Sequence, residues 1–161
     1  MRLYLVQHAD AVQASVDPER PLSPGGRNTA RSLAEACARY HFEATEVIHS
    51  GKARARETAE AIGAACKLEA RAVPGLDPLD PVPPFAMECL SLHSTIVVGH
   101  LPFLERLVSL LLAGREDPPV LAFQRGGMVC LERRGTPETA ASLGAWCLLW
   151  TAFPDQVHTG G

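Results

Sequence analysis

The chain has 161 residues, of which 47% are hydrophobic, and a formal charge of −3 at pH 7, so it is long enough to bury a core as one domain. Its positive and negative side chains are dispersed and give no basic stripe of the kind that nucleic-acid binding needs. No apolar run approaches the roughly 20 residues of a membrane span, so we expect neither a nucleic-acid partner nor a membrane partner.

Five cysteines are widely spaced and odd in number, with no C-x-x-C pair and no secretory leader before them. We therefore expect reduced thiols in the core of a cytoplasmic protein. The cysteines are Cys37, Cys66, Cys89, Cys130 and Cys147.

The first part of the chain alternates strand and helix patterns. Residues 3–6 form an apolar run that predicts a buried strand, and residues 23–40 carry apolar positions at helical spacing after a capping serine. Residues 46–49 predict a second strand, and the alanine-rich residues 53–66 predict a second helix. This β-α-β-α order is typical of a parallel sheet.

The middle of the chain continues this alternation around a long loop. Residues 68–73 predict a third strand, and residues 74–84 an irregular loop because their prolines disfavour regular structure. A helix near residues 85–92 and a strand at residues 95–98 are predicted to follow. The loop is long enough to flank a site.

The last part of the chain has a different pattern. Residues 103–112 predict an apolar helix that ends at Gly114. Residues 120–123, 128–132 and 145–151 are β-like without a strong helix between them, which favours antiparallel pairing at one sheet edge. We therefore predict the α/β class: a three-layer α/β/α sandwich with a mostly parallel sheet and an antiparallel strand towards its C-terminal edge.

Two histidines follow predicted strands directly. His8 comes after the first strand and His100 after the strand at residues 95–98, while Arg54 lies just beyond the second strand. Because the carboxyl ends of parallel strands line the ligand crevice of an α/β sheet, we expect the three side chains to converge. A neutral imidazole can attack phosphorus and an arginine matches phosphoryl oxygens, so this set predicts phosphoryl transfer through a phosphohistidine.

Simpler interpretations apply to single histidines. One histidine after a strand is usually a structural hydrogen-bonding residue, and only the combination with a second histidine and Arg54 favours catalysis. No H-x-x-x-H or C-x-x-C pair is present, so no metal site is expected. The remaining histidines are interpreted as surface or packing residues: His41, His49, His93 and His158.

Four segments carry a resemblance to a known family. They are Leu5-Val6-Gln7-His8-Ala9-Asp10, Arg20-Pro21-Leu22-Ser23 with Gly25-Gly26, Ser50-x-x-x-Arg54-Ala55-x-x-Thr58, and Val98-Gly99-His100-Leu101-Pro102. In order and spacing they resemble the histidine phosphatase (phosphoglycerate mutase-like) superfamily, and within it the small SixA-like phosphohistidine phosphatases. The resemblance extends to the closing Trp150-x-x-x-Pro154. It implies a phosphoglycerate mutase-like fold, one histidine phosphatase domain over residues 1–161, and no cofactor.

The resemblance also implies roles for individual residues. His8 matches the nucleophile that accepts the phosphoryl group, and His100 matches the second histidine, which flanks the phosphorus and donates to its oxygens when protonated. Arg54 and Arg20 match arginines of the phosphate pocket.

Two further residues of these segments receive lesser roles. Ser50 is interpreted as a turn residue rather than a ligand. Asp10 is given a structural or histidine-orienting role rather than a catalytic one.

The chain departs from the family pattern at Gln7, where an arginine is usual. Gln7 offers the phosphoryl group a neutral amide donor in place of a permanent cation, so we expect weakened activity that Gln7→Arg would raise. Lys52, Arg20 and Arg125 are the candidates that would supply the missing charge.

No general acid stands out. Asp77 and Asp80 in the proline-rich loop are the nearest candidates, although turns also favour aspartate there. An imidazole leaving group needs less acid help than an alkoxide, which favours a phosphohistidine substrate.

Three functions remain open. The favoured one is a cytoplasmic, metal-independent phosphatase that removes phosphate from phosphohistidine in a signalling protein, such as a histidine phosphotransfer domain. The second is a phosphatase of small phosphate esters. The third is a catalytically weakened module that binds phosphate or a phosphoprotein.

Overall fold

A computed structural model describes residues 1–40, 42–135 and 143–154. Its strands are β1 (Arg2–Gln7), β2 (Glu46–His49), β3 (Ala70–Ala72), β4 (Thr95–Gly99), β5 (Met128–Arg134) and β6 (Ala145–Ala152). Its helices are α1 (Pro24–Arg39), α2 (Ala53–Cys66), α3 (Val82–Glu88) and α4 (Phe103–Ala113). In this described part of the chain, the strands form one sheet with the order β3-β2-β4-β1-β5-β6.

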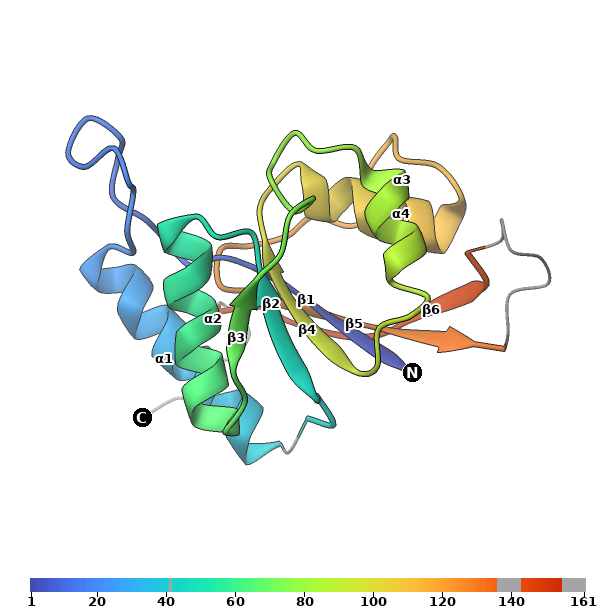
Figure 1. Cartoon of the computed structure of the whole chain (residues 1–161), viewed down its shortest axis with the longest axis horizontal. Coiled ribbons are helices and arrows are strands. Elements are labelled where there is room, and N and C mark those ends of the chain that lie inside the picture. Colours follow the sequence, from blue (N-terminus) through green and yellow to red (C-terminus); the bar gives the residue numbers. More distant parts are fainter. Residues whose placement is uncertain (41, 136–142, 155–161) are drawn as a thin grey trace.

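The centre of the sheet is parallel. Strand β4 lies between β2 and β1 and runs parallel to both, with Gln7 opposite Gly99. Strand β5 pairs antiparallel with β1, and β6 antiparallel with β5. This arrangement confirms the predicted mostly parallel sheet with antiparallel pairing towards the C-terminal edge. It also brings the carboxyl ends of the inner strands β1, β2 and β4 to the same side of the sheet, where these strands end (Figure 1).

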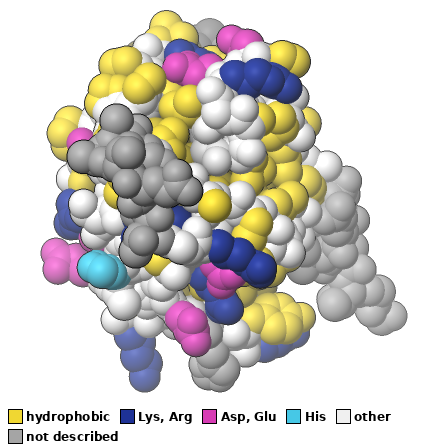
Figure 2. All heavy atoms as spheres, turned by 90° about the vertical axis from the view of Figure 1, so that its right-hand side faces the viewer, with side chains coloured by type: hydrophobic (Ala, Val, Ile, Leu, Met, Phe, Trp, Pro, Cys, Tyr) yellow, Lys and Arg dark blue, Asp and Glu magenta, His cyan; other side chains and the backbone are white. Residues whose placement is uncertain are grey.

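The two faces of the sheet bury different side chains of the same strands. Along β1, Leu3 and Leu5 pack with α3 and α4, whereas Tyr4 and Val6 pack with α1 and α2. This alternation follows from the period of two in a strand, and it makes the three layers visible in Figure 1. On the face shown in Figure 2, basic and acidic side chains are interspersed.

The start of α1 is fixed by its cap and by a close backbone approach. The Ser23 hydroxyl accepts a hydrogen bond from the Gly26 amide at 3.0 Å, which confirms the predicted cap. A Cβ atom on Gly26 would lie 1.9 Å from the Asp10 carbonyl oxygen, so a residue with a side chain would force the two segments apart. The first turn of α1 therefore packs directly on the segment that leaves β1.

One predicted loop contains the start of a helix. The prolines of residues 74–84 led us to expect irregular structure throughout, but α3 begins at Val82, and Pro83 and Pro84 lie in its first turn. Prolines are tolerated there because the first amides of a helix have no intrahelical partner. The helix ends at Glu88, earlier than predicted.

The strand predicted over residues 120–123 is absent. The Val120 amide donates to the Ser109 hydroxyl at 3.0 Å, and the Phe123 amide donates to Glu105 Oε1 at 3.2 Å. Side chains of α4 thus satisfy backbone donors that a strand would direct to its neighbour. The prediction failed because these partners are distant in the sequence.

Candidate active site

The two histidines that follow β1 and β4 lie side by side. Gln7 and Gly99 are register partners, so His8 and His100 leave adjacent parallel strands at the same level. Their ring centroids are 4.9 Å apart with an interplanar angle of 58°, and the residues are 9% and 1% exposed. The convergence expected from the sequence is therefore present at the carboxyl edge of the sheet.

Hydrogen bonds define the tautomer of His8. Its Nδ1 lies 2.7 Å from the Ala9 carbonyl oxygen, which can only accept, so Nδ1 carries the proton. The other nitrogen, Nε2, then holds a lone pair, and the Arg54 Nε donates to it at 3.2 Å. The atom of His8 that can act as a nucleophile thus faces a guanidinium group.

Helix α2 brings Arg54 to this position. Arg54 lies in the first turn of α2, so the positive end of the helix dipole points to the same place. One turn later the buried Thr58 hydroxyl donates to the Arg54 carbonyl at 2.8 Å and accepts from the Ala9 amide at 3.2 Å. This hydroxyl ties the segment after His8 to the helix that carries the arginine.

His100 contacts Ser50, the residue that directly follows β2. Its Nε2 lies 2.6 Å from the Ser50 hydroxyl, and its Nδ1 is buried with no hydrogen-bond partner among the described residues. Sequence reasoning treated Ser50 only as a turn residue. The signal that would have revealed this contact is strand order, because a β2 placed beside β4 sets Ser50 next to His100.

Both imidazoles are neutral at pH 7. Burial lowers the pKa of His8 to about 4, and the nearby Arg54 acts in the same direction. Burial also lowers the pKa of His100 to about 3, with smaller contributions from His8 and Arg54. The His8 imidazole is therefore unprotonated over the physiological pH range, and a negatively charged phosphoryl group would favour protonation of His100.

Gln7 is neutral at the position where the family pattern usually has an arginine. The residue is 7% exposed, and its Oε1 is buried with no hydrogen-bond partner in the described part of the chain. Of the candidates for the missing charge, Arg20 contributes to the lowered pKa of both histidines and donates to the Val12 carbonyl at 3.3 Å. Arg20 thus lies close enough to act on the site electrostatically.

The other two candidate cations are already in ion pairs. Lys52 Nζ lies 3.0 Å from Asp77 Oδ2, and Arg125 lies 2.5 Å from Asp10 Oδ1. Their charges are therefore partly neutralised in the free protein.

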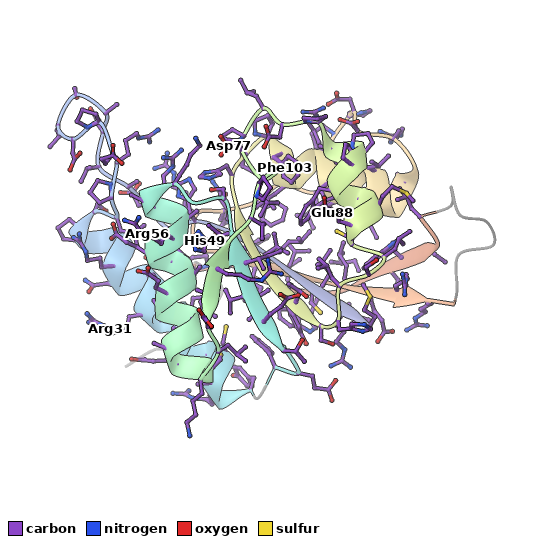
Figure 3. The ribbon with its side chains drawn as sticks, viewed as in Figure 1. Arg31, His49, Arg56, Asp77, Glu88 and Phe103 are labelled. Atoms are coloured by element: carbon purple, nitrogen blue, oxygen red, sulfur yellow. The ribbon has the colours of Figure 1, made fainter. Side chains whose placement is uncertain are left out.

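Geometry distinguishes the three aspartates near the site. Asp77, labelled in Figure 3, is paired with Lys52, and Asp80 accepts a hydrogen bond from the Asp77 amide at 2.8 Å. Asp10 accepts from the Ser23 hydroxyl at 2.8 Å, and this bond, with Arg125, lowers its pKa. These contacts give Asp10 a structural role between β1 and α1, and give Asp80 the turn role that its sequence context suggested.

The remaining histidines lie apart from this cluster. His49, labelled in Figure 3, is buried at the end of β2, where its Nδ1 accepts from the Gly51 amide at 3.0 Å. His93 is exposed. His41 and His158 lie outside the described residues. Over the described ranges, no three His, Cys, Asp or Glu side chains are grouped to hold a metal ion, and no helix is long and apolar enough to cross a membrane.

Two neutral histidines and an arginine at the carboxyl ends of parallel strands form an arrangement that can transfer phosphoryl groups through histidine. The model of the histidine phosphatase superfamily (branch 1) matches residues 3–80. The phosphohistidine phosphatase SixA of Escherichia coli K12 is 29% identical over 143 residues, which cover 84% of this chain and 88% of that protein. Over its N-terminal part the chain is thus similar to the histidine phosphatase superfamily, and over most of its length it is similar to this phosphohistidine phosphatase.

Solved structures share the fold. The protein histidine phosphatase SixA complexed with tungstate superposes with a TM-score of 0.80 at 24% identity, covering 98% of this chain and 99% of that one. A mycobacterial glucosyl-3-phosphoglycerate phosphatase superposes with a TM-score of 0.74 at 17% identity, covering 94% and 99%. The predicted phosphoglycerate mutase-like architecture is thereby confirmed.

Proposed function

We propose that this phosphatase removes phosphate from phosphohistidine in a signalling protein, with His8 as the nucleophile and without a metal ion. The observation that carries the proposal is the state of His8, a buried neutral imidazole whose Nε2 lone pair faces Arg54. The phosphohistidine phosphatase named above, which matches most of the chain, supports the substrate class.

In the first step, His8 Nε2 attacks the phosphorus of the substrate. A P–Nε2 bond forms while the substrate P–N bond breaks, and the leaving imidazole nitrogen keeps the electron pair and takes up a proton from solvent. Arg54 must then direct its donors from Nε2 to the phosphoryl oxygens, where charge-assisted hydrogen bonds stabilise the transition state. The Nδ1–H bond to Ala9 stabilises the positive charge that develops on His8.

In the second step, water attacks the phosphorus and the P–Nε2 electron pair returns to His8. One water proton stays on the phosphate, which leaves as hydrogen phosphate, and the other balances the proton taken up by the leaving imidazole. His100, protonated once the phosphoryl charge is next to it, donates to the phosphoryl oxygens in both steps.

The carboxylates beside the site support cleavage of a P–N rather than a P–O bond. Asp77 is paired with Lys52, and Asp80 accepts a hydrogen bond from the Asp77 amide, so both carboxylates already have partners in the free protein. An imidazole is a better leaving group than an alkoxide and depends less on a general acid. Small phosphate esters are the second candidate substrates, because this fold also occurs in a phosphatase of glucosyl-3-phosphoglycerate.

The decisive experiment is His8→Ala. We expect loss of turnover and of an acid-labile, base-stable phosphoenzyme trapped from radiolabelled substrate, because no other residue replaces the Nε2 nucleophile. His93→Ala, which removes an exposed histidine, is the matched control and should retain both. Turnover that survives His8→Ala would refute the assigned nucleophile.

The substrate class needs its own comparison. We expect a higher kcat/KM on a phosphohistidine-bearing protein than on a panel of sugar phosphates, and the reverse order would favour the ester function. We also propose a cytoplasmic location, which is supported by the five cysteines, all of them free thiols.

A further inference from the structure

Ser50 makes the only hydrogen bond to the His100 ring within the described part of the chain. The Ser50 hydroxyl lies 2.6 Å from His100 Nε2, whereas Nδ1 is buried without a partner among the same residues. The contact follows from the strand order, because β2 lies beside β4 and His49 is the register partner of Val98. His100 donates to the phosphoryl oxygens in the proposed reaction, so the group that holds its ring can affect catalysis.

The two histidines of the site have different kinds of hydrogen-bond partner. His8 Nδ1 lies 2.7 Å from the Ala9 carbonyl oxygen, which can only accept, so this contact fixes one tautomer of His8. A serine hydroxyl can both donate and accept. It can therefore stay bonded to His100 Nε2 whether or not that nitrogen carries a proton. The partner of His8 suits a ring that keeps its lone pair on Nε2, and the partner of His100 suits a ring whose protonation changes during the reaction.

The surroundings of His100 disfavour its protonated form. Burial has the largest effect on the pKa of its ring, and the neighbouring side chains act in the same direction. These neighbours come from the end of β1, the start of α2 and the loop between β1 and α1, and they are His8, Arg54, Lys52 and Arg20. Within the described ranges no carboxylate is hydrogen-bonded to the ring. When a phosphoryl group supplies the negative charge, the Ser50 hydroxyl is thus the protein group placed to accept a hydrogen bond from protonated His100.

We propose that Ser50 is a positioning residue of the phosphoryl-transfer reaction, and that its hydroxyl holds the His100 ring in one orientation while the ring changes between its neutral and protonated forms. This inference rests on the proposed function, in which His8 is the nucleophile and His100 donates to the phosphoryl oxygens. When the phosphoryl group binds, His100 takes up a proton from solvent. It returns that proton to solvent when phosphate leaves. The hydroxyl accompanies both changes without rotation of the ring, because it can exchange its donor role for an acceptor role.

The pH profile of kcat for Ser50→Ala tests this role. The substrate is p-nitrophenyl phosphate, because phosphohistidine is labile in acid. Above the pKa of His100 in the substrate complex, the ring loses its proton and kcat falls, which gives the profile an alkaline limb. A charged donor makes the stronger hydrogen bond, so loss of the hydroxyl disfavours protonated His100 more than neutral His100. We therefore expect the alkaline limb to move towards acid by about 0.5–1 pH unit, which lowers kcat on that limb by about three- to ten-fold.

Three further variants separate positioning from structure. Ser50→Thr keeps the hydroxyl and should keep the alkaline limb of wild type. Ser109→Ala is the matched structural control, because this buried hydroxyl donates to the Glu105 carbonyl at 2.8 Å and accepts from the Val120 amide at 3.0 Å. It should lower the midpoint of urea unfolding and leave the limb in place. His100→Gln should lack the limb, and adding Ser50→Ala to it should lower kcat no further, because Ser50 acts through His100.

Other results would overturn the inference and the proposed function separately. An alkaline limb of Ser50→Ala at the wild-type pH would overturn the positioning role, even if kcat falls at every pH. Additive losses in the double variant would also overturn it, and so would a limb in Ser50→Thr that moves as far as in Ser50→Ala. In each of these cases the proposed function stands as long as turnover depends on His8. Wild-type protein that forms no phosphoenzyme with any phosphorylated substrate would overturn the proposed function itself.

Discussion

The two helical layers of the molecule serve the site in different ways. Helix α2 packs on the sheet through small residues such as Ala55 and Ala59, and it also carries Arg54 and the Thr58 hydroxyl. Helix α4, whose first residue Phe103 is labelled in Figure 3, buries large apolar side chains, and Phe103 contacts Phe85 of α3 at a centroid distance of 5.9 Å. One layer positions the candidate catalytic groups, whereas the other buries large apolar side chains.

The stability of the fold and the positioning of the site residues therefore depend on different layers. Small residues allow α2 to approach the sheet closely. Because α2 carries Arg54, a displacement of this helix by less than 1 Å would move Arg54 relative to His8. A cavity in the α3–α4 layer removes apolar packing but touches no catalytic hydrogen bond. The predictions below test that separation, beginning with the largest expected effect.

Leu107→Ala should have the largest effect on stability. Leu107 is fully buried in α4, and truncation of a buried leucine removes about 2–5 kcal/mol from the free energy of unfolding. Activity of the folded variant, assayed at low temperature, should stay within about two-fold of wild type. Urea unfolding and kcat on the same preparation measure the two effects, and a parallel loss of kcat would show that the layers are not separable.

The second prediction concerns acid stability of the site. The folded pKa values of His8, about 4, and His100, about 3, lie below the ordinary value of 6.5, so the unfolded chain binds more protons between pH 6.5 and 4. Their contribution is fully present above pH 6.5 and is lost as the pH falls. At pH 5 the loss is on the order of 2 kcal/mol per histidine.

His100→Gln isolates this effect. Urea unfolding at pH 7, 6 and 5 should show a smaller fall in stability for the variant than for wild type. His93→Gln, at an exposed histidine, should follow wild type. Identical pH dependence in all three proteins would contradict the inference that His100 is buried in its neutral form.

Thr58→Val tests the positioning layer directly. The substitution keeps the shape of the side chain but removes the hydroxyl that joins Ala9 to Arg54. We expect a stability loss of about 1 kcal/mol and a roughly ten-fold fall in kcat, because the His8 segment is no longer tied to α2. Thr58→Ser keeps the hydroxyl and should retain most of the activity, so equal effects of the two substitutions would attribute the loss to packing.

Local signals explain what could be predicted from the sequence. The bounds of β2 and α2 were predicted to the residue, because a short run with two apolar residues, a high alanine content and a flanking glycine are signals that act within a few positions. The grouping of His8 with His100 followed from a general property of parallel sheets. Such features need no knowledge of which strands are neighbours.

Features that depend on distant partners could not be predicted in this way. The Ser50–His100 contact requires β2 to lie beside β4, and the Lys52–Asp77 pair requires the long loop to fold back over α2. The absence of a strand at residues 120–123 depends on side chains of α4. In each case the decisive group lies more than ten residues away in the sequence.

Gln7→Arg is expected to have the smallest effect. It tests whether the neutral amide of Gln7 limits activity or is itself required by the site. A charged donor stabilises an anion by about 1 kcal/mol more than a neutral one, so turnover of an aryl phosphate should rise five- to ten-fold. Gln7→Met, which has a similar volume and no amide, separates charge from shape. If the Arg and Met substitutions both lower kcat, the amide itself is part of the pocket. Since Gln7 leaves β1 beside His8, that result would extend the positioning role from the α1–α2 layer to the sheet itself.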